Sequence, residues 1–562
     1  MMVIFSSCNK EEEITTVLPP AIKLVDYDGK YTVKQGAKLT IAPEYESVEG
    51  ALYSWTIDGK EIGNNRFLIY SWNETGTQIV SLEVTTDYGK AQKNIRIEVV
   101  ELEIPFVTLP DADKGYTLSV GAELTFLPVV KETTLEQKYT WQLDGKKVSD
   151  EKNYTFKSER KGKYNLKFVA STSDGSDEIQ FEVEVMELSD LPFSWTFEKE
   201  VYNYAKGRTI KISPLTLSKT EGVNFIWKMD GEEVQNGNKS YWLCAVDKEG
   251  KHQLEVIASL TSNGKNVWVS HQLEVNVCPA EGQYKRAVAA ASAADFNEVY
   301  EYLPAPGQFI NENYNAVSAA DAIAKAKEKL TKKQYVSLGG FGGYIVLGFD
   351  HSIDNGTGHD FGVYGNAYDG SSEPGIVWVM QDENGDGKPN DTWYELKGSE
   401  TGKAETRQNY SVTYYRPSAP GMDVQWKDSE GQTGTIDYIK DMHKQDYYYP
   451  TWLETDSYTL YGTCLKARNY DQSGDGSYWV QPAYDWGYAD NYSATDHIAN
   501  KGKIKGKANL FDIDNAIGHD GKTVKLKYID FVKVQNGVNS KSGWLGELST
   551  EVFGCFDYSL MK

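Results

Sequence analysis

Three evenly spaced tryptophans organise the first half of the chain. Trp55 opens WTIDGK, Trp141 opens WQLDGK and Trp227 opens WKMDGE, so successive tryptophans lie 86 positions apart (141 − 55 and 227 − 141). Each tryptophan precedes an Asp-Gly pair, which favours a tight turn between two strands. Alternating apolar and polar residues follow in each repeat, as in SLEVTT, NLKFVAST and QLEVIASL. This pattern predicts three antiparallel β-sandwiches, each with its tryptophan in the core.

The repeated tryptophan and Asp-Gly turn, with the closing EV-type strands, resemble the PKD or Ig-like modules of bacterial surface proteins. The resemblance implies modules at about 17–101, 102–187 and 188–279. Tandem modules of this kind imply a stalk, and they leave residues 280–562 as a larger C-terminal ligand-binding domain. The predicted fold class is therefore mainly β.

The first residues of the chain predict that the protein is anchored to a membrane by lipid. Met1 to Cys8 reads MMVIFSSC, which is similar to the end of a bacterial lipoprotein signal. The following NKEEE resembles the charged signal that sends Bacteroidetes lipoproteins to the outer face of the outer membrane. We expect residues 1–16 to be a signal remnant and tether, with Cys8 lipidated and the protein anchored at the cell surface. A plain cytoplasmic start is the alternative.

The charge and the aromatic content of the chain indicate which classes of partner it can bind. The formal net charge is −23, with 81 acidic against 58 basic residues, and this repels nucleic acid. We therefore expect no nucleic-acid partner. Aromatic residues make up 13% of the chain, and rigid amphipathic rings of this kind favour ligand binding.

Four later cysteines show no spacing typical of a zinc site: Cys244, Cys278, Cys464 and Cys555. Cys244 with Cys278, and Cys464 with Cys555, could pair within domains. Buried free thiols are the alternative, and the sequence does not decide between them.

Two short helices are expected at the start of the C-terminal domain. Residues 284–302 are alanine-rich without Pro or Gly, which favours a helix that LPAPG would end. Residues 318–330 read SAADAIAKAKEKL, with Ser318 and Asp321 placed as an N-terminal capping pair. Both helices are expected to pack against a sheet.

An oxygen-rich loop follows the run GIVWVM. Oxygen-bearing side chains alternate before Gly387, which is the first half of a calcium loop. Trp393 stands where an EF-hand needs a bidentate Glu, and both flanks read as strands, so we predict structural calcium within a β-hairpin. A metal-free turn is the alternative. The predicted ligands, with Lys388 acting through its carbonyl, are Asp382, Asn384, Asp386, Lys388, Asn390 and Asp391.

A second acidic loop repeats part of this pattern. Asp471, Ser473 and Asp475 alternate before Gly476 in NYDQSGDGSYW. Serine is a weaker ligand at the middle position, so a metal-free turn is the favoured interpretation there.

Residues 335–558 resemble one family throughout, on the blocks NGTGHDFGVYGNA, SEPGIVWVMQDENGDGKPNDTWYELKGSE, FDIDNAI and IDFVKVQ. On these blocks the region is identified as a member of the Bacteroidetes cell-surface lipoproteins often encoded with outer-membrane vitamin B12 uptake systems, the cobalamin-binding BtuH-type family. The resemblance implies a jelly-roll-like β-sandwich. It also implies capture of cobalamin or a related corrinoid for a TonB-dependent transporter.

Two aromatic stretches would suit a flat, amide-fringed corrinoid, namely DYYYPTW and YWVQPAYDWGYADNY. Aromatic faces should pack on the macrocycle while polar groups bond its amides. Packing of these loops against the core is the alternative. The predicted ligand-binding residues are Tyr447, Tyr448, Tyr449, Trp452, Tyr478, Trp479, Tyr484, Trp486 and Tyr488.

Two other classes of function stay open. A jelly roll with calcium and exposed aromatics could instead bind glycans for a polysaccharide uptake system. A glycosidase would need two carboxylates at a defined separation. No G-x-S-x-G, HExxH or Cys/His nucleophile signature is present, so we expect no enzyme.

Overall fold

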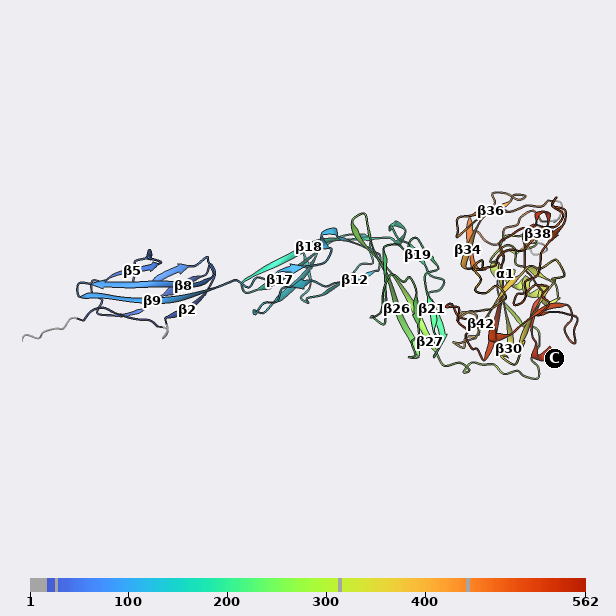
Figure 1. The fold of residues 1–562 in the computed structure, drawn as a ribbon, viewed down its shortest axis with the longest axis horizontal. Helices are drawn as coiled ribbons and strands as arrows, with labels where there is room; N and C mark the ends of the chain where they lie inside the picture. The colour runs from blue at the N-terminus through green and yellow to red at the C-terminus, as the bar shows by residue number, and fades with distance from the viewer. Residues whose placement is uncertain (1–17, 26–28, 312–315, 441–444, 562) are drawn as a thin grey trace, which may run out of the picture. The chain divides into compact units, whose positions relative to one another are not determined.

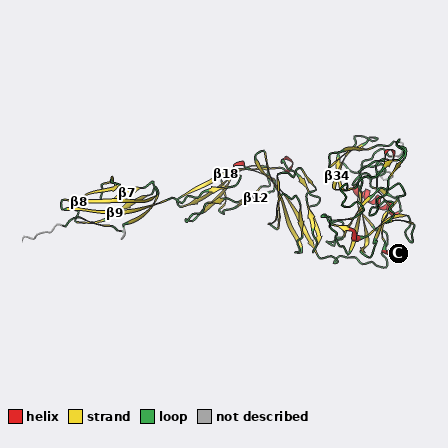
Figure 2. Ribbon diagram, viewed as in Figure 1, coloured by secondary structure: helices red, strands yellow, loops and turns green. Residues whose placement is uncertain are grey.

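The computed structural model describes residues 18–25, 29–311, 316–440 and 445–561. The fold is mainly β, as predicted, and Figure 2 shows strands throughout with only short helical pieces. The predicted tether at 1–16, including Cys8, lies outside the described residues. The chain divides into two compact units: Met1–Leu191 with Thr261–Trp268, and Pro192–Leu260 with Val269–Lys562.

The first module is built on a five-stranded sheet (Figure 1). Its strands, in spatial order, are β2 (Lys30–Lys34), β9 (Gly89–Val100), β8 (Gly76–Thr86), β5 (Leu52–Ile57) and β6 (Lys60–Gly63). Two further pairs are β3 (Lys38–Ile41) with β7 (Leu68–Ser71) and β1 (Ala21–Lys23) with β4 (Glu44–Glu46). Ile41 and Leu68 share a core with Val80 and Ile97, so the pairs cover one face of the sheet.

The second module repeats this arrangement. Its main strands are β11 (Tyr116–Ser119), β18 (Gly175–Met186), β17 (Gly162–Thr172), β14 (Lys138–Leu143) and β15 (Lys146–Ser149). The additional pairs are β12 (Glu123–Phe126) with β16 (Tyr154–Lys157) and β10 (Val107–Thr108) with β13 (Val129–Val130). As in the first module, one strand of the sheet, β11, runs parallel to its neighbour β18.

The third module has the same plan. Its strands are β20 (Val201–Ala205), β27 (Lys265–Cys278), β26 (Gly250–Ser262), β23 (Val223–Met229) and β24 (Glu232–Gly237). The additional pairs are β21 (Ile210–Ile212) with β25 (Trp242–Cys244) and β19 (Trp195–Thr196) with β22 (Thr216–Leu217).

The repeated tryptophans lie in the three cores, as predicted. Trp55, Trp141 and Trp227 are each 0% exposed. The Asp-Gly pair after each tryptophan forms the turn into the next strand, and both residues have positive φ, for example 48° at Asp144 and 78° at Gly145. Positive φ at two successive residues is typical of the type I′ hairpin turn, which explains why Asp-Gly recurs.

The C-terminal domain contains three larger sheets. The six-stranded sheet has the order β28 (Glu298–Leu303), β30 (Tyr344–Asp354), β43 (Tyr528–Asn536), β32 (Gly375–Met380), β33 (Tyr394–Leu396) and β42 (Ala516–Ile517). The second has the order β40 (His497–Ala499), β41 (Lys507–Phe511), β31 (Phe361–Gly365) and β45 (Gly554–Asp557). The third has the order β36 (Thr433–Ile436), β35 (Val424–Asp428), β34 (Arg407–Tyr415) and β37 (Ser457–Cys464). Two short pairs are β29 (Val336–Ser337) with β44 (Glu551–Val552) and β38 (Tyr470–Asp471) with β39 (Trp479–Val480).

The first two of these sheets share one hydrophobic core. Leu347 and Val532 of the six-stranded sheet lie in the same cluster as Phe361 and Phe511 of the second sheet. Such face-to-face packing is what a β-sandwich requires, although the sheets do not close into a barrel.

One of the two predicted helices is present. Helix α1 (Ala319–Thr331) begins where the sequence indicates, and Ser318 Oγ accepts the N–H of Asp321 at 3.1 Å. The prediction for 284–302 is wrong, because residues 284–297 form no helix and 298–303 are strand β28. The short alanines offer little apolar surface to bury, whereas Val299 and Tyr302 reach the core once the segment pairs with β30.

The four described cysteines are buried free thiols: Cys244, Cys278, Cys464 and Cys555. Neither pair considered from the sequence forms a disulfide. The Cys244 thiol instead contacts the hydroxyl of Tyr204 at 3.3 Å.

Candidate functional site

Five of the nine predicted ligand-binding aromatics lie in the core, which corrects their assignment: Tyr448, Tyr449, Trp452, Tyr484 and Tyr488. Tyr448 and Tyr449 pack in the cluster that contains Val412 of β34. Tyr484 and Tyr488 pack with Ile376. Because a ring enclosed by apolar neighbours has no free face, these residues cannot stack on a ligand from solvent.

The other four predicted aromatics differ in exposure. Tyr447 and Trp486 are half-buried. Trp486 borders a pocket of about 70 Å³ together with His359 and Asp512. Pockets for small-molecule ligands usually measure about 300–1,000 Å³, so this one is too small for a macrocycle. Tyr478 is exposed and Trp479 is half-buried, and both belong to the surface described next.

An aromatic surface forms where three loops of the C-terminal domain meet. We define the aromatic loop surface as Tyr368, Tyr470, Tyr478, Trp479 and Trp544. The exposed fractions of Tyr368, Tyr470, Tyr478 and Trp544 are 59%, 48%, 59% and 45%. The sequence prediction missed Tyr368, Tyr470 and Trp544, because isolated aromatics in separate loops carry no local signal of their proximity.

Backbone pairing brings these loops together. Strands β38 and β39 pair Tyr470 with Val480, and Gln481 donates its N–H to the carbonyl of Gly370 at 2.8 Å. The third loop joins through Asn469 Nδ2, which donates to the carbonyl of Lys541 at 2.9 Å. Gly543 lies against the Trp479 indole, where an added Cβ would come within 2.5 Å of Nε1. The fold therefore fixes the positions of the aromatic loops.

The predicted calcium loop connects β32 to β33, which pair as an antiparallel hairpin as expected. Asp382 accepts the N–H of Gly385 at 2.9 Å on Oδ1 and that of Gly387 at 3.0 Å on Oδ2. Gly387 has φ of +73°, a conformation that favours glycine. These two bonds curl the loop back onto the Asp382 carboxylate.

Asp391 is the least satisfied of the predicted ligands. It is 0% exposed, and its Oδ2 accepts the N–H of Glu383 at 2.9 Å. Its Oδ1 has no hydrogen-bond partner among the described residues. Burial, reinforced by the nearby charges of Asp382 and Asp386, raises the pKa of Asp391 to about 7. A cation in the loop would compensate this unpaired oxygen.

The remaining predicted ligands form hydrogen bonds within the loop, and one of them also contacts the third module. Asn384 Oδ1 accepts the N–H of Asp386 at 2.9 Å, and Asn390 Nδ2 donates to Asp386 Oδ2 at 2.8 Å. The Asn390 carbonyl accepts from Asn203 Nδ2 at 3.4 Å, so it is engaged with the third module. The Lys388 carbonyl accepts the N–H of Asn390 at 2.9 Å.

The second acidic loop is satisfied internally. Asp471 Oδ1 accepts the N–H of Ser473 at 3.0 Å, and its Oδ2 accepts the N–H of Gly476 at 2.7 Å. Hydrogen bonds from Ser477 and Ser473 lower the pKa of Asp475 to about 2. Hydrogen bonds of this kind favour the ionised form of a carboxylate.

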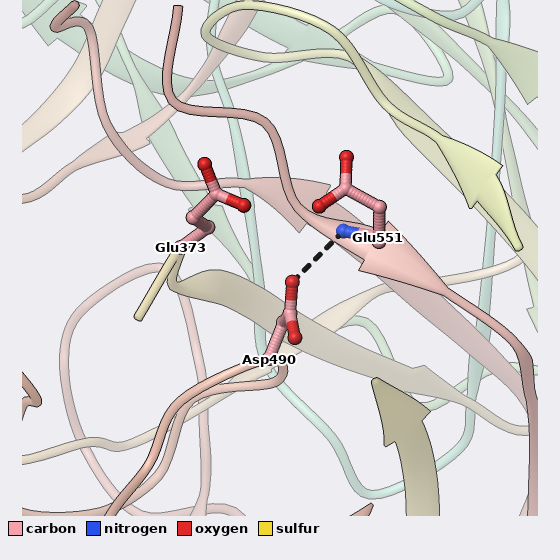
Figure 3. Close-up of side chains that lie close together, drawn as sticks. All are labelled: Glu373, Asp490 and Glu551. Carbon is pink, nitrogen blue, oxygen red and sulfur yellow. Dashed lines mark hydrogen bonds between the residues drawn. The ribbon is translucent and has the colours of Figure 1, made fainter. Parts of the chain in front are cut away.

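A third acidic group, invisible in the sequence, lies inside the C-terminal domain (Figure 3). Carboxylate oxygens of Glu373, Asp490 and Glu551 lie within 4.8 Å of one another. Asp490 Oδ1 accepts the N–H of Asn366 and of Ala367, each at 2.8 Å, which holds the loop that leads to Tyr368. We call these three residues the carboxyl triad.

Two members of the carboxyl triad, Glu373 and Glu551, are expected to hold protons at higher pH than ordinary carboxyl groups do. Burial, together with the charge of Asp490, raises the pKa of Glu373 to about 8. Burial, with the charge of Glu373 beside it, holds the pKa of Glu551 well above its usual range. A carboxylate oxygen of Glu373 lies within 4.8 Å of one of Glu551. This arrangement fits a proton shared between two carboxyl groups.

Comparison with known proteins identifies the repeats. The PKD-like domain family matches residues 19–86 and 105–172. The chain carries tandem PKD-like, Ig-like modules. Modules of this kind are typically non-catalytic. No curated protein matches the chain.

Parts of the chain are similar to several solved structures. The I-band fragment I67-I69 from titin is 16% identical, with a TM-score of 0.22, and the match covers 47% of this chain and 99% of that one. Fibronectin(III)-like modules of Clostridium thermocellum CbhA are 20% identical, with a TM-score of 0.15, covering 33% and 100%. Three domains of the bacteriophage RB49 Hoc protein are 12% identical, with a TM-score of 0.22, covering 46% and 98%.

Within the described residues, no helix has the length and apolar character needed to cross a membrane.

Proposed function

We propose that the protein captures a ligand at the cell surface, that the PKD-like modules display the C-terminal domain, and that the ligand is cobalamin or a related corrinoid. The proposal includes a lipid anchor at Cys8 on the outer face of the outer membrane. It also includes transfer of the ligand to a TonB-dependent transporter. Its starting point is the resemblance of residues 335–558 to surface lipoproteins of vitamin B12 uptake.

The observation that supports capture most directly is the aromatic loop surface. Its exposed rings offer apolar faces of the kind on which a flat macrocycle can pack. Polar groups lie in the same loops, including Asn469 and Lys541. Such groups could bond the amides at the edge of a corrin ring. A surface of this kind suits a ligand that must later pass to a transporter, because it leaves one side of the ligand accessible.

The direct test is binding of cyanocobalamin. Purified protein mixed with cyanocobalamin and passed over a desalting column should carry the pink ligand in the protein fraction. Tyr478→Ala combined with Trp544→Ala should weaken binding by at least about tenfold, since each ring–ligand contact contributes roughly 1 kcal/mol or more. The matched control is Tyr88→Ala, which removes an exposed tyrosine, 63% accessible, from the first module. Colourless protein at high ligand concentration would contradict the corrinoid proposal.

A glycan is the second candidate ligand, because the same exposed rings can stack on sugar faces. Affinity gels carrying plant or mucin glycans would retard the protein in that case. Retardation that disappears in the Tyr478→Ala, Trp544→Ala variant, together with absence of cobalamin binding, would favour the glycan function.

The anchor has a separate test. Cys8→Ala should move the protein from the membrane fraction to the soluble fraction of the cells that produce it. Ligand binding by the purified variant should be unchanged, because the proposed ligand surface belongs to the C-terminal domain. Retention in the membrane fraction would contradict lipidation at Cys8.

A further inference from the structure

The loop between β32 and β33 contacts two parts of the second compact unit. On one side it continues the six-stranded sheet of the C-terminal domain. On the other side Thr392 Oγ1 donates to the carbonyl of Asn203 in β20 of the third module at 2.9 Å. If the backbone of this loop becomes more rigid, its hydrogen bond to β20 should therefore make that strand of the third module more rigid as well.

A lysine of the third module bonds backbone carbonyls of this loop. Lys199 of the third module donates to the backbone carbonyl of Asp391, and to that of Asn390 at 3.5 Å. Its ammonium group is thus engaged on the side of the loop that faces the third module. The unpaired Oδ1 of Asp391 is a separate acceptor, with no hydrogen-bond partner among the described residues.

The geometry of Asp391 is the observation that points to a bound ion. The carboxylate is fully buried, and its Oδ2 is fixed to the N–H of Glu383, the residue next to Asp382. A buried carboxylate oxygen without a partner is costly, so it calls for a group that the protein itself does not supply. By contrast, both carboxylate oxygens of Asp471 in the second acidic loop accept backbone N–H groups.

We propose that the loop binds a hard divalent cation of the calcium class, and that the bound ion clamps the third module onto the C-terminal domain. The ligands would be the side chains of Asp382, Asn384, Asp386 and Asp391 with the Lys388 carbonyl, whereas the Asn390 carbonyl bonds the third module. An all-oxygen set with several carboxylates favours Ca²⁺, which tolerates irregular geometry, over Zn²⁺, which prefers nitrogen and sulfur. The ion would act as a clamp because Asp391, which it binds, is adjacent to Thr392, which bonds the carbonyl of Asn203 in the third module. An ion that holds Asp391 in place would also hold Thr392 in place.

Metal binding can be tested on the full chain with Tb³⁺ as a probe, since Trp393 lies two residues from Asp391 and can sensitise its luminescence. We expect saturable Tb³⁺ luminescence that Ca²⁺ displaces. Asp386→Ala, at an exposed position, should weaken Tb³⁺ binding by about tenfold or more. Asp391→Asn should do the same, and Asp386→Ala keeps the test valid if the buried variant fails to fold. Asp475→Ala, in the second acidic loop, is the matched control and should bind as the parent protein does. Equal binding by Asp386→Ala and the parent would overturn the site.

The clamp has its own readout in hydrogen–deuterium exchange. Added Ca²⁺ should slow amide exchange both in residues 382–392 and in β20 of the third module, and chelation should reverse the effect. Asp386→Ala should abolish this Ca²⁺-dependent protection, whereas Asp475→Ala should retain it. Protection limited to the loop, with β20 unchanged, would overturn the clamp while leaving the metal site. Neither measurement involves cobalamin, so failure of the metal site can be distinguished from failure of the proposed ligand capture.

Discussion

Arg208 of the third module lies between two carboxylates of the C-terminal domain. Its Nη2 is 3.0 Å from Glu281 Oε1 and its Nε is 3.6 Å from Glu383 Oε1. The Arg208 side chain is only 11% exposed and Glu383 only 2%, so the pair is screened from water. Burial raises the pKa of Glu383 to about 8, and Arg208 opposes this rise. The ion pair between Arg208 and Glu281 therefore links the third module to the domain that follows it.

Arg208→Ala should destabilise the second compact unit by about 3–5 kcal/mol, because it leaves buried carboxylates without their partner. Chemical denaturation of the parent and the variant would measure this loss. Lys206→Ala is the control, since Lys206 and Glu249 form an exposed pair. Removal of such a pair should cost no more than about 1 kcal/mol. Equal losses in both variants would show that Arg208 carries no special role.

The tryptophan cores predict localised effects of mutation. Trp141→Ala should cost about 3–5 kcal/mol, because it removes a fully buried indole from the second module. Differential scanning calorimetry should show a lowered transition for the first compact unit and an unchanged transition for the second. Lys138→Ala, at an exposed position of the same strand, should leave both transitions in place. A uniform shift of all transitions would contradict independent folding of the units.

The carboxyl triad predicts a pH dependence of stability. The folded-state pKa of Glu373 is raised to about 8, and that of Glu551 is also raised, so the folded state holds protons that the unfolded state releases. The stability that these protons contribute is fully present below about pH 4, where the carboxyl groups of the unfolded chain are also protonated. It is lost as the pH rises toward the folded-state pKa of about 8. Glu547 and Lys507 are the other charged groups that act on the triad.

Glu373→Gln tests that dependence, because an amide has no proton to lose. The free energy of unfolding of the variant, relative to the parent, should increase between pH 5 and pH 8 by on the order of 2 kcal/mol. Denaturant titrations at several pH values, in chelator, would measure the difference. A parallel pH dependence in parent and variant would show that the triad does not titrate in this range.

Replacement of Asp382 and Asp386 by alanine should reduce stability first and ligand binding only as a consequence. The two side chains shape the loop between β32 and β33, which lies apart from the aromatic loop surface in the sequence. At a temperature where the variant is still folded, its affinity for the ligand should equal that of the parent. A lost affinity in the fully folded variant would place the loop in the ligand site. Replacement of Asp471 and Asp475 provides the matched control for stability.

Local sequence signals predicted much of the architecture correctly. The Asp-Gly turns, the alternating strands and the buried tryptophans depend on neighbours within one hairpin, so Trp55, Trp141 and Trp227 could be placed from their own repeats. The cap at Ser318 is equally local, because its hydroxyl bonds an N–H three residues away. The hairpin around Asp382 was also predicted from its flanks.

The features that the sequence did not predict correctly depend on packing between residues far apart in the chain. Alanine-rich residues 284–302 have helix propensity, yet β28 pairs with β30, and this sheet pairing outweighs propensity. Tyr448 and Tyr484 resemble exposed loop aromatics in sequence, but their neighbours in space enclose them.

The sequence by itself determined the three β-sandwich repeats, their cores and turns, and the oxygen-rich character of the loop at Asp382, because each is encoded within a few neighbouring residues. Only the tertiary structure decided which aromatics reach solvent and that Glu373, Asp490 and Glu551 meet. It also decided that one oxygen of Asp391, beside the third module, has no hydrogen-bond partner among the residues that the structure describes. Burial and electrostatic environment are properties of surroundings in space, and distant parts of the chain supply those surroundings.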